Sequence, residues 1–383
     1  MADLYPEAEA GFAFDNEVLK EAVKRIYERK FNPMTEIDTG LFNAVWNTLN
    51  IATNEGYGER TPTDPDFDFY HELRYNNAVF SAFKVHRAQN DMAKLLLDSK
   101  GNLKSFEQWS KEVKPIASHQ FDGWLRTEYD TAVLRARLAA DWKQFEREAD
   151  VLPNIRWVPS TSIHPGADHR IFWNTVRPID DPFWSQHRPG DRWNCKCGLE
   201  NTDDPVTDIP YVPADDKPSP GLENRPEKDA KLFSDTHPYI KHAYKGAEKA
   251  VKKTVQSAVT RRMKELRLEA KPLTEKTFSH PDFAKEMTIS NKGIKEWLNQ
   301  PHEHQAQKNE LILGLENLIR NSIYRGSGED IHDRSVKVHL FEVEILGSKS
   351  WIIVREFLNG RTVIYSISDS PNILGIIKKK LPQ

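Results

Sequence analysis

The stretch IHPGADHRIFWNTVRPIDDPFWSQHRPGDRWNCKCGLE, from Ile163 to Glu200, is the most informative part of this 383-residue sequence. It contains both cysteines of the chain, three of its ten tryptophans and three histidines. The stretch shows neither the helical nor the strand period, so something other than long regular elements must hold it in place. Its cysteines and histidines are residue types that bind zinc, as thiolates and imidazoles.

A zinc site is one interpretation of this stretch, with His169, Cys195 and Cys197 as ligands and the fourth ligand unassigned. A closed metal site would order a segment that has few regular elements. However, one residue separates the two cysteines, whereas the cysteine pairs of ordinary zinc fingers are separated by about two to four residues. Buried cysteines that stabilise a tight turn are therefore the alternative. Either interpretation predicts reduced thiols and a cytoplasmic setting.

The run Asp180-Asp181-Pro182 favours the start of a helix, because Pro is common at the first helical position and an acidic residue before it caps the helix. We expect this role for the two carboxylates rather than a catalytic one. Tryptophans are expected to form the core here, since a small irregular segment needs large apolar side chains. These tryptophans are Trp173, Trp184 and Trp193.

Helical periodicity precedes this stretch. Residues 15–60 are predicted to be helical with breaks at Pro33 and Gly40, and residues 70–97 are predicted to be helical as well. Between residues 121 and 145, apolar side chains recur at spacings of three and four, which predicts one long amphipathic helix. Pro153 is expected to end it.

After Glu200 the sequence changes character twice. Six prolines lie between Asn201 and Pro226, which predicts an extended linker or wrapping arm, and Lys241–Arg267 predicts a basic helix. A helix near 303–324 is followed by strand-like runs at 335–346, 351–358 and 361–367. The fold class is therefore α+β multidomain, with a mostly helical N-terminal domain and a small C-terminal α+β domain that contains an antiparallel meander. The predicted domain boundaries are 1–200, 201–232 for the arm, 233–270 for the basic helix, and 271–383.

Composition excludes several classes of protein. The hydrophobic content of 38% and charged content of 29% indicate a folded soluble protein, and the net charge of −3 provides no global basic field for nucleic acid. No apolar run approaches the roughly 20 residues of a membrane helix. The acidic start lacks the basic region of a secretory signal.

The C-terminal strands can be aligned through Asn359-Gly360, a strong hairpin signal. A two-residue loop pairs Leu358 with Arg361 and, further along, Arg355 with Ile364. This register predicts a core face of Ile352, Val354, Val363, Tyr365 and Ile367 with Glu356 as its only charge, whereas Ile364 lies on the other face. The apolar phase switches near Leu340-Phe341, so we predict a bulge there that places His339 on the polar face.

On this register one side of the sheet would hold several polar side chains. They are His339, Glu342, Arg355, Thr362 and Ser366. Cleavage of RNA without a metal needs a base, an acid and a cation, and histidine and arginine suit these roles. His302 and His304, before the predicted helix, are further candidates or simple surface and capping residues. A solvent-facing polar surface with an ordinary ion pair is the alternative interpretation of this face.

The N-terminal part resembles the head-morphogenesis family typified by the bacteriophage Mu F protein. The resemblance covers residues 111–239 and rests on Glu128-Tyr129-Asp130-Thr131-Ala132-Val133, on His169 eleven positions before Asp180-Asp181-Pro182-Phe183-Trp184, and on Trp193-Asn194-Cys195-Lys196-Cys197. His237-Pro238-Tyr239 also fits the end of the pattern. Relatives often have an arginine three positions before the histidine and Leu-Asp-Gly after it. Here Gly166 and Phe172-Trp173-Asn174 stand at those places.

The C-terminal part resembles the barnase–EndoU–colicin–RelE-like nuclease domains of some prophages. This resemblance covers residues 273–380 and rests on Ile289-Ser290-Asn291-Lys292-Gly293-Ile294, on the region of His302 and His304, and on Tyr365-Ser366-Ile367-Ser368-Asp369-Ser370. It implies a metal-independent endoribonuclease that needs no cofactor. His339, Arg355, Ser366, Thr362, Glu342 and His304 are its candidate catalytic residues.

Together the two resemblances imply a minor head protein of a phage or prophage that carries a ribonuclease-like toxin domain. Its expected partners are portal and capsid proteins, an RNA substrate and an inhibitor protein that protects the producer, with no membrane. Its expected location is the bacterial cytoplasm during assembly and then the virion, in the capsid interior or at the portal. Two alternatives remain open: a purely structural head protein whose last domain is a non-catalytic interaction module, and a zinc-organised module that binds nucleic acid.

Overall fold

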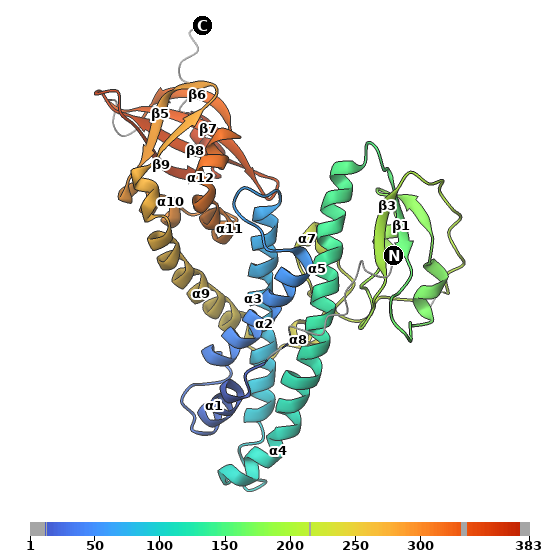
Figure 1. Ribbon diagram of the computed structural model, residues 1–383. Coiled ribbons are helices and arrows are strands. Elements are labelled where there is room, and N and C mark those ends of the chain that lie inside the picture. The colour runs from blue at the N-terminus through green and yellow to red at the C-terminus, as the bar shows by residue number, and fades with distance from the viewer. Residues whose placement is uncertain (1–11, 13, 214–215, 331–334, 376–383) are drawn as a thin grey trace. The chain divides into compact units, whose positions relative to one another are not determined.

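The computed structural model describes residues 12, 14–213, 216–330 and 335–375 (Figure 1). The chain divides into two compact units. The first consists of Met1–Glu59 and Leu73–Gln256, and the second of Arg60–Glu72 and Ser257–Gln383. The predicted α+β class is confirmed, since the first unit is mainly helical and the second is built on a large, mostly antiparallel sheet. None of the described helices is long and apolar enough to cross a membrane.

Helices dominate the first unit, and short acidic caps define where two of them begin. The Asp15 side chain accepts a hydrogen bond from Glu17 N, and the Asp38 side chain accepts one from Leu41 N, so each satisfies a free amide of a first turn. Gly56 allows two helices to cross closely, because a Cβ there would lie 2.1 Å from the Val133 carbonyl oxygen. The helices are α1 (Asn16–Tyr27), α2 (Thr39–Tyr57), α3 (Phe67–Ala93), α4 (Phe106–Ser118) and α5 (Trp124–Glu148), and only the part of α3 from Leu73 onward belongs to this unit.

The predicted helix at 121–145 is confirmed as α5, which begins slightly later than expected. A π-helical turn at His119–Gly123 joins α4 to α5 and contains Phe121. The predicted apolar stripe is buried, as the exposures of Leu125, Tyr129 and Ala132 show. This stripe is the surface of α5 on which the rest of the unit packs.

A small antiparallel sheet in the order β2-β1-β3 follows α5. Its strands are β1 (Asn154–Val158), β2 (Val176–Pro178) and β3 (Gly198–Thr202). Two short helical turns lie between them, η2 (Asp168–Phe172) and α6 (Phe183–Gln186). The strands are short and the loops long, so this region depends on side-chain contacts more than on its backbone ladder.

The proline-rich segment, predicted as an extended linker or wrapping arm, packs against the rest of the first unit, as the second alternative expected. Leu222 is fully buried, and Thr207 N donates to the Val176 carbonyl at 3.1 Å. The buried guanidinium of Arg135 explains this, because it donates hydrogen bonds to the carbonyls of Leu222 and Leu232. After this segment come α7 (Pro226–Asp229), α8 (Pro238–Lys241) and α9 (Ala247–Glu269), and α9 confirms the predicted basic helix.

The second unit has a six-stranded sheet in the order β4-β5-β9-β8-β7-β6. Its β5–β9 pair is parallel and its other pairs are antiparallel. The predicted meander is confirmed as β7 (Lys337–Ile345), β8 (Ser348–Glu356) and β9 (Thr362–Ser368). The other strands are β4 (Thr277–His280), β5 (Phe283–Ile289) and β6 (Ile323–Glu329), and α10 (Asn291–Asn299) connects β5 to the next helices.

The helix predicted near 303–324 is divided into shorter pieces. They are α11 (Gln305–Glu310), a 3₁₀ turn at Leu311–Gly314 and α12 (Leu315–Arg320). Gly314 lies against Pro62, where a Cβ would come within 2.3 Å of the proline side chain. This close approach comes from a distant part of the sequence, so local periodicity did not indicate it.

The predicted register of the last hairpin was wrong near its turn. Phe357 N donates to the Arg361 carbonyl at 2.9 Å, and Gly360 has a φ of 80°, so the loop is wider than two residues. Arg355 therefore pairs with Val363 rather than Ile364. The pairing of Ile353 with Ser366 agrees with the predicted register again, because Tyr365 is an extra residue in β9 and compensates for the shift at the turn.

The bulge predicted near Leu340-Phe341 occurs opposite these two residues, but the extra residue belongs to the neighbouring strand. Strand β7 pairs with β8 without interruption, and the irregularity lies on its other side, in β6 at Arg325. Both faces of the meander are consequently apolar in the middle. One face carries Phe341, Val343, Ile345, Ile352, Val354, Ile364 and Ile367 in the main core, and the other carries Val338, Leu340 and Trp351 in a smaller cluster.

Candidate functional sites

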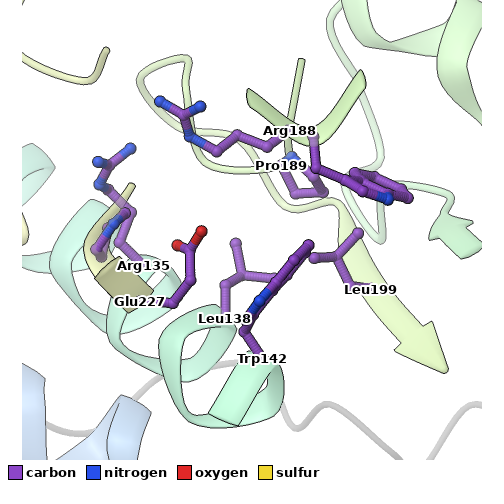
Figure 2. Close-up of a pocket in the computed structure, with 9 residues that line it drawn as sticks. Arg135, Leu138, Trp142, Arg188, Pro189, Leu199 and Glu227 are labelled. Carbon is purple, nitrogen blue, oxygen red and sulfur yellow. The ribbon is translucent and has the colours of Figure 1, made fainter. Parts of the chain in front are cut away.

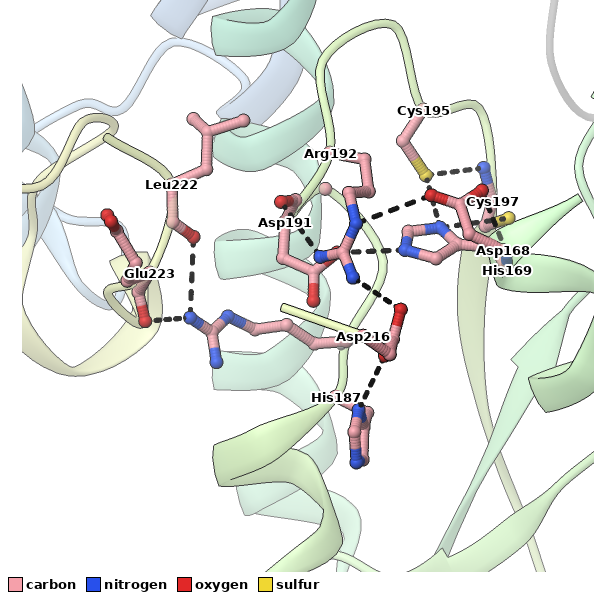
Figure 3. Close-up of polar contacts among 12 residues, drawn as sticks. Asp168, His169, His187, Asp191, Arg192, Cys195, Cys197, Asp216, Leu222 and Glu223 are labelled. Carbon is pink, nitrogen blue, oxygen red and sulfur yellow. Dashed lines mark hydrogen bonds and ion pairs between the residues drawn. The ribbon is translucent and has the colours of Figure 1, made fainter. Parts of the chain in front are cut away.

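His169, Cys195 and Cys197 meet in the first unit, as the sequence predicted (Figure 3). Their ligand atoms all lie within 4.8 Å of one another. The Nδ1 atom of His169 is 3.3 Å from Cys195 Sγ and 3.9 Å from Cys197 Sγ. The group is well shielded, since His169 and Cys197 are buried and Cys195 is half-buried.

Local structure fixes each member of this group. His169 lies on the η2 turn and packs edge-on against Trp157 of β1, with 5.1 Å between ring centroids. Cys197 directly precedes β3 and belongs to an apolar cluster with Trp157 and Phe172. Trp184 is fully buried in the same cluster, which confirms its predicted core role.

The other ring nitrogen of His169 is held by a carboxylate. His169 Nε2 lies 2.8 Å from Asp191 Oδ1. Because an ionised carboxylate can only accept hydrogen bonds, Nε2 carries a proton whether the ring is neutral or charged, and Nδ1 is the nitrogen that faces the two sulfurs. The Arg192 guanidinium joins Asp191 to Asp168 and Asp216, and Asp216 also contacts a ring nitrogen of His187 at 3.4 Å (Figure 3).

Charges in this group are strongly coupled. Burial acts to lower the pKa of His169, but its hydrogen bonds with Asp191 and Cys197 outweigh burial and raise the pKa to about 9. The hydrogen bond from Cys195 and the contact with His169 lower the pKa of Cys197 to about 5. The same contact with Cys197, together with burial, raises the pKa of Cys195. The metal-free group therefore holds a thiolate beside an imidazolium.

These residues fit a zinc ion. Nδ1, the ring nitrogen that faces the sulfurs, would offer its lone pair to the metal after losing its proton, and a carboxylate behind a ligating imidazole is the usual outer-shell partner in zinc proteins. His169, Cys195 and Cys197 would hold the metal, which would cross-link the η2 turn to the loop before β3. With three protein ligands identified, the arrangement suits a structural ion or one with an open position.

Asp181 caps the start of α6 as predicted, but the helix begins at Phe183, so Pro182 stands at the N-cap and not at the first helical position. The Oδ1 atom of Asp181 accepts a hydrogen bond from Phe183 N at 2.8 Å, at the start of α6, and its other oxygen binds Arg177. This role is structural, and it agrees with the expectation of capping rather than catalysis.

A small cavity lies beside this region, between α5 and β3 (Figure 2). Its volume is about 20 Å³, and its walls include Leu138, Trp142, Leu199 and the stems of two buried arginines, Arg135 and Arg188. A cavity of this size has room for about one water molecule. It is therefore a packing defect and too small for an organic ligand.

The five polar residues predicted to converge in the second unit lie on both faces of the sheet, which corrects that prediction. His339 and Thr362 share the face of the main core, because His339 pairs with Val354 and Thr362 with Glu356. Glu342, Arg355 and Ser366 lie on the opposite face, since their partners there are Trp351, Val363 and Ile353. The extra residue at Tyr365 and the uninterrupted β7 ladder cause this division.

On the opposite face each predicted residue has its own neighbours. The Arg355 guanidinium lies 3.6 Å from the centroid of the Tyr365 ring and 3.0 Å from Asp330 Oδ2. Glu342 binds Arg325, and this hydrogen bond lowers the pKa of Glu342 to about 2. Ser366 is buried. Both contacts are ion pairs between a partly exposed arginine and a largely buried carboxylate.

His339 is the centre of a polar group on the main-core face. His339 Nε2 lies 2.7 Å from Glu356 Oε2, and His339 Nδ1 lies 2.9 Å from the Tyr324 hydroxyl. Lys285 of β5 binds the other oxygen of Glu356. The ring of Phe283 packs on His339 with 4.7 Å between centroids, so β5 lies close to β6 and β7. We call Lys285, Tyr324, His339 and Glu356 the His339 group.

Sequence reasoning found His339 in this group and missed its three partners. One signal for Glu356 was visible, since it was the only charge on a predicted core face. Thr362 lies nearby, but its hydroxyl donates to the Glu286 carbonyl. Lys285 and Tyr324 carried no signal, because the pairing that brings β5 and β6 to β7 is long-range.

The two earlier histidines form a different contact. His302 Nδ1 accepts a hydrogen bond from His304 N, so His302 Nε2 carries the proton and donates to Ser350 Oγ at 2.9 Å. In this tautomer His302 cannot take the proton of Ser350. His304 stands at the N-terminus of α11 without a side-chain capping hydrogen bond.

Comparison with known proteins finds one matching family model within each unit. Residues 99–200 match the family model described as Phage Mu protein F like protein, which includes the whole His169, Cys195 and Cys197 group. Residues 258–365 match the model described as Large polyvalent protein-associated domain 3. The predicted Mu F-like domain is therefore confirmed for this part of the chain, and the match supports the phage head-morphogenesis family.

One curated relative is capsid assembly protein F of Escherichia phage Mu. It is 28% identical over 103 residues, which are 27% of this chain and 21% of that protein. The chain thus matches about a fifth of the relative's length. No solved structure matches the chain.

Proposed function

We propose that this chain is a minor head protein that takes part in assembling a phage or prophage particle. The match of residues 99–200 to the Mu F-like model and to a capsid assembly protein supports this proposal. Its partners would be portal and capsid proteins. The chain would act in the bacterial cytoplasm during assembly and then remain in the capsid interior or at the portal.

In this proposal His169, Cys195 and Cys197 stabilise the fold of the Mu F-like domain. A zinc ion held by His169, Cys195 and Cys197 would supply a cross-link between loops and no chemistry of its own. The loops that it joins carry little regular structure, so the fold of the matched segment would depend on it.

Particle composition tests the proposal. The host strain is induced, DNA-filled heads are purified on a density gradient, and the chain is quantified by mass spectrometry. We expect the chain in the heads, and fewer filled heads with Cys197→Ser than with the matched control Lys196→Ala, whose side chain is exposed between the two cysteines. Filled heads that lack the chain, in normal number, would contradict a head function.

A second function is supported by the His339 group, namely metal-independent cleavage of RNA by the second unit. A neutral imidazole with a carboxylate on one nitrogen and a hydroxyl on the other, next to an exposed lysine, provides a base and a cation without a metal. The domain would be a toxin that travels with the particle, and an inhibitor protein would protect the producing cell.

Incubation of the full chain with transfer RNA in EDTA tests this second function. We expect fragments that end in 2′,3′-cyclic phosphate. Intact RNA, with a chain shown to be folded by circular dichroism, would leave the second unit as a non-catalytic interaction module of a structural head protein.

A further inference from the structure

The His339 group contains a directed chain of hydrogen bonds. Glu356 is ionised at neutral pH, because its hydrogen bond with Lys285, opposed in part by burial, lowers the pKa of its carboxyl group. It can therefore only accept from His339, which places the imidazole proton on Nε2. The unprotonated Nδ1 must then accept from the Tyr324 hydroxyl. The imidazole has the tautomer that can take the proton of Tyr324.

Exposure decides which of these groups a substrate can reach. The His339 side chain is 3% exposed, and the ring of Phe283 covers it. Tyr324 is half-buried, and the Lys285 side chain is 47% exposed. A substrate can approach the tyrosine and the lysine, whereas both nitrogens of the imidazole are already occupied.

We infer that Tyr324 and Lys285 are the catalytic residues. Tyr324 contacts the ribose 2′-hydroxyl of an RNA substrate and Lys285 its departing 5′-oxygen, and His339 and Glu356 are positioning residues behind Tyr324. The inference rests on the ribonuclease function proposed above. It differs from the sequence prediction, in which His339 and Arg355 act directly on the substrate.

The chemistry balances with the residues present. The substrate 2′-hydroxyl gives its proton to the Tyr324 oxygen as Tyr324 gives its own to His339 Nδ1. The 2′-oxygen then forms a bond to phosphorus, and the bond from phosphorus to the 5′-oxygen breaks. The departing oxygen takes a proton from the Lys285 ammonium, and the imidazolium beside Glu356 returns its proton to Lys285 through solvent.

Removal of one hydroxyl tests the inference in the full chain. Tyr324→Phe is compared with Tyr365→Phe, a matched change on the opposite face of the sheet, where the ring contact with Arg355 is preserved. The substrate is a short labelled RNA in EDTA, and a copy with a 2′-deoxy sugar at the cleaved position is the chemical control. We expect Tyr324→Phe to cleave about 10²–10⁴-fold more slowly and Tyr365→Phe to stay within about threefold of the wild type.

The pH dependence of the RNA cleavage rate distinguishes a positioning role of His339 and Glu356 from a general effect on the fold. The wild-type rate should rise with pH and level off above the pKa of His339, which burial lowers and the Glu356 contact raises. Tyr324, Glu356 and Lys285 face the ring from other strands, and Lys337 lies on its own strand. Glu356→Gln removes the negative charge, so the acid limb of the profile should move to lower pH.

Each outcome has one meaning. A slow Tyr324→Phe that binds RNA normally, together with a shifted limb in Glu356→Gln, supports the inference. Cleavage by the wild type and by Tyr324→Phe at equal rates overturns it and leaves the ribonuclease function standing. A wild-type chain that does not cleave RNA overturns both.

Discussion

Each unit contains a histidine whose Nε2 atom contacts a carboxylate. The partner of the other ring nitrogen, Nδ1, differs between the two units. Nε2 lies 2.8 Å from Asp191 in His169 and 2.7 Å from Glu356 in His339. Nδ1 of His169 faces two sulfurs, whereas Nδ1 of His339 faces a hydroxyl at 2.9 Å. Both rings are buried.

This difference shows that the partner of Nδ1 decides whether the imidazole suits metal binding or proton transfer. In both units the carboxylate keeps a proton on Nε2, so the neutral form of either ring has its lone pair on Nδ1. Thiolates beside that lone pair complete a set of soft ligands and favour a metal. A hydroxyl there offers a proton instead and favours proton transfer. The predictions below change one partner at a time.

The largest effect is expected from the sulfur side of His169. Structural zinc contributes about 10–16 kcal/mol in zinc-finger peptides, so the loss of one of three or four ligands costs roughly 3–4 kcal/mol, or a few hundredfold in affinity. Cys197→Ser should therefore lose the single zinc per chain that we expect in the wild type. Mass spectrometry of the metal in purified full-length chain measures this.

Lys196→Ala, between the two ligands, is the matched control and should keep its zinc. A wild-type chain that is folded and purified from zinc-supplied cells without the metal would identify the cysteines as packing residues of a turn.

A smaller effect is expected on the carboxylate side of the same ring. Asp191→Asn preserves the shape of the side chain but removes the negative charge beside His169 Nε2. Loss of such an outer-shell partner typically weakens metal affinity about 10–100-fold. Competition with a chromophoric chelator measures the change. Unaltered affinity in Asp191→Asn would show that the carboxylate belongs to the Arg192 ion-pair network rather than to the metal group.

The last three strands, β7, β8 and β9, the α5 stripe and the grouping of His169, Cys195 and Cys197 could be predicted because their signals are local. Asn359-Gly360 indicates a turn, and His169, Cys195 and Cys197 are conspicuous by residue type. Asp191 is 22 positions from His169 in sequence and resembles any surface aspartate until the fold brings them together.

The face assignments failed because alternation alone does not fix a register. One extra residue at Tyr365 places Ile364 on the face of the main core and Val363 on the opposite face. Similarly, an assumed bulge in β7 placed His339 on the wrong face, when the irregularity lies in the neighbouring strand β6. Strand β6 itself was not predicted, since its two glycines, Gly326 and Gly328, weaken the strand signal.

A third histidine shows what the carboxylate contributes. His237 is buried, its Nδ1 accepts from Tyr239 N, and no carboxylate of the described residues hydrogen-bonds to it. Burial, with a smaller effect of Lys84, lowers its pKa to about 3. A folded-state pKa below the unfolded value means that stability is complete above about pH 6.5 and falls as pH decreases toward 3.

When the pH is lowered from 7 to 5, the protonation of His237 in the unfolded state should reduce the free energy of unfolding by about 2 kcal/mol. Urea unfolding followed by tryptophan fluorescence measures it. His237→Asn can still cap α8 and should remove that part of the pH dependence. If His237→Asn lost as much stability at pH 5 as the wild type does, other titratable groups would cause the effect.

The smallest effect is expected at Arg355, which lies on the face opposite His339. Arg355→Lys retains a positive charge next to Asp330, and the RNA cleavage rate should stay within about threefold of the wild type. Lys285→Met removes the cation beside Glu356 on the face of His339 and should slow cleavage by about 10²-fold. If Arg355→Lys were as slow as Lys285→Met, the phosphate would have to bind on the face of Arg355. The division of the sheet into one reactive and one structural face would then be wrong.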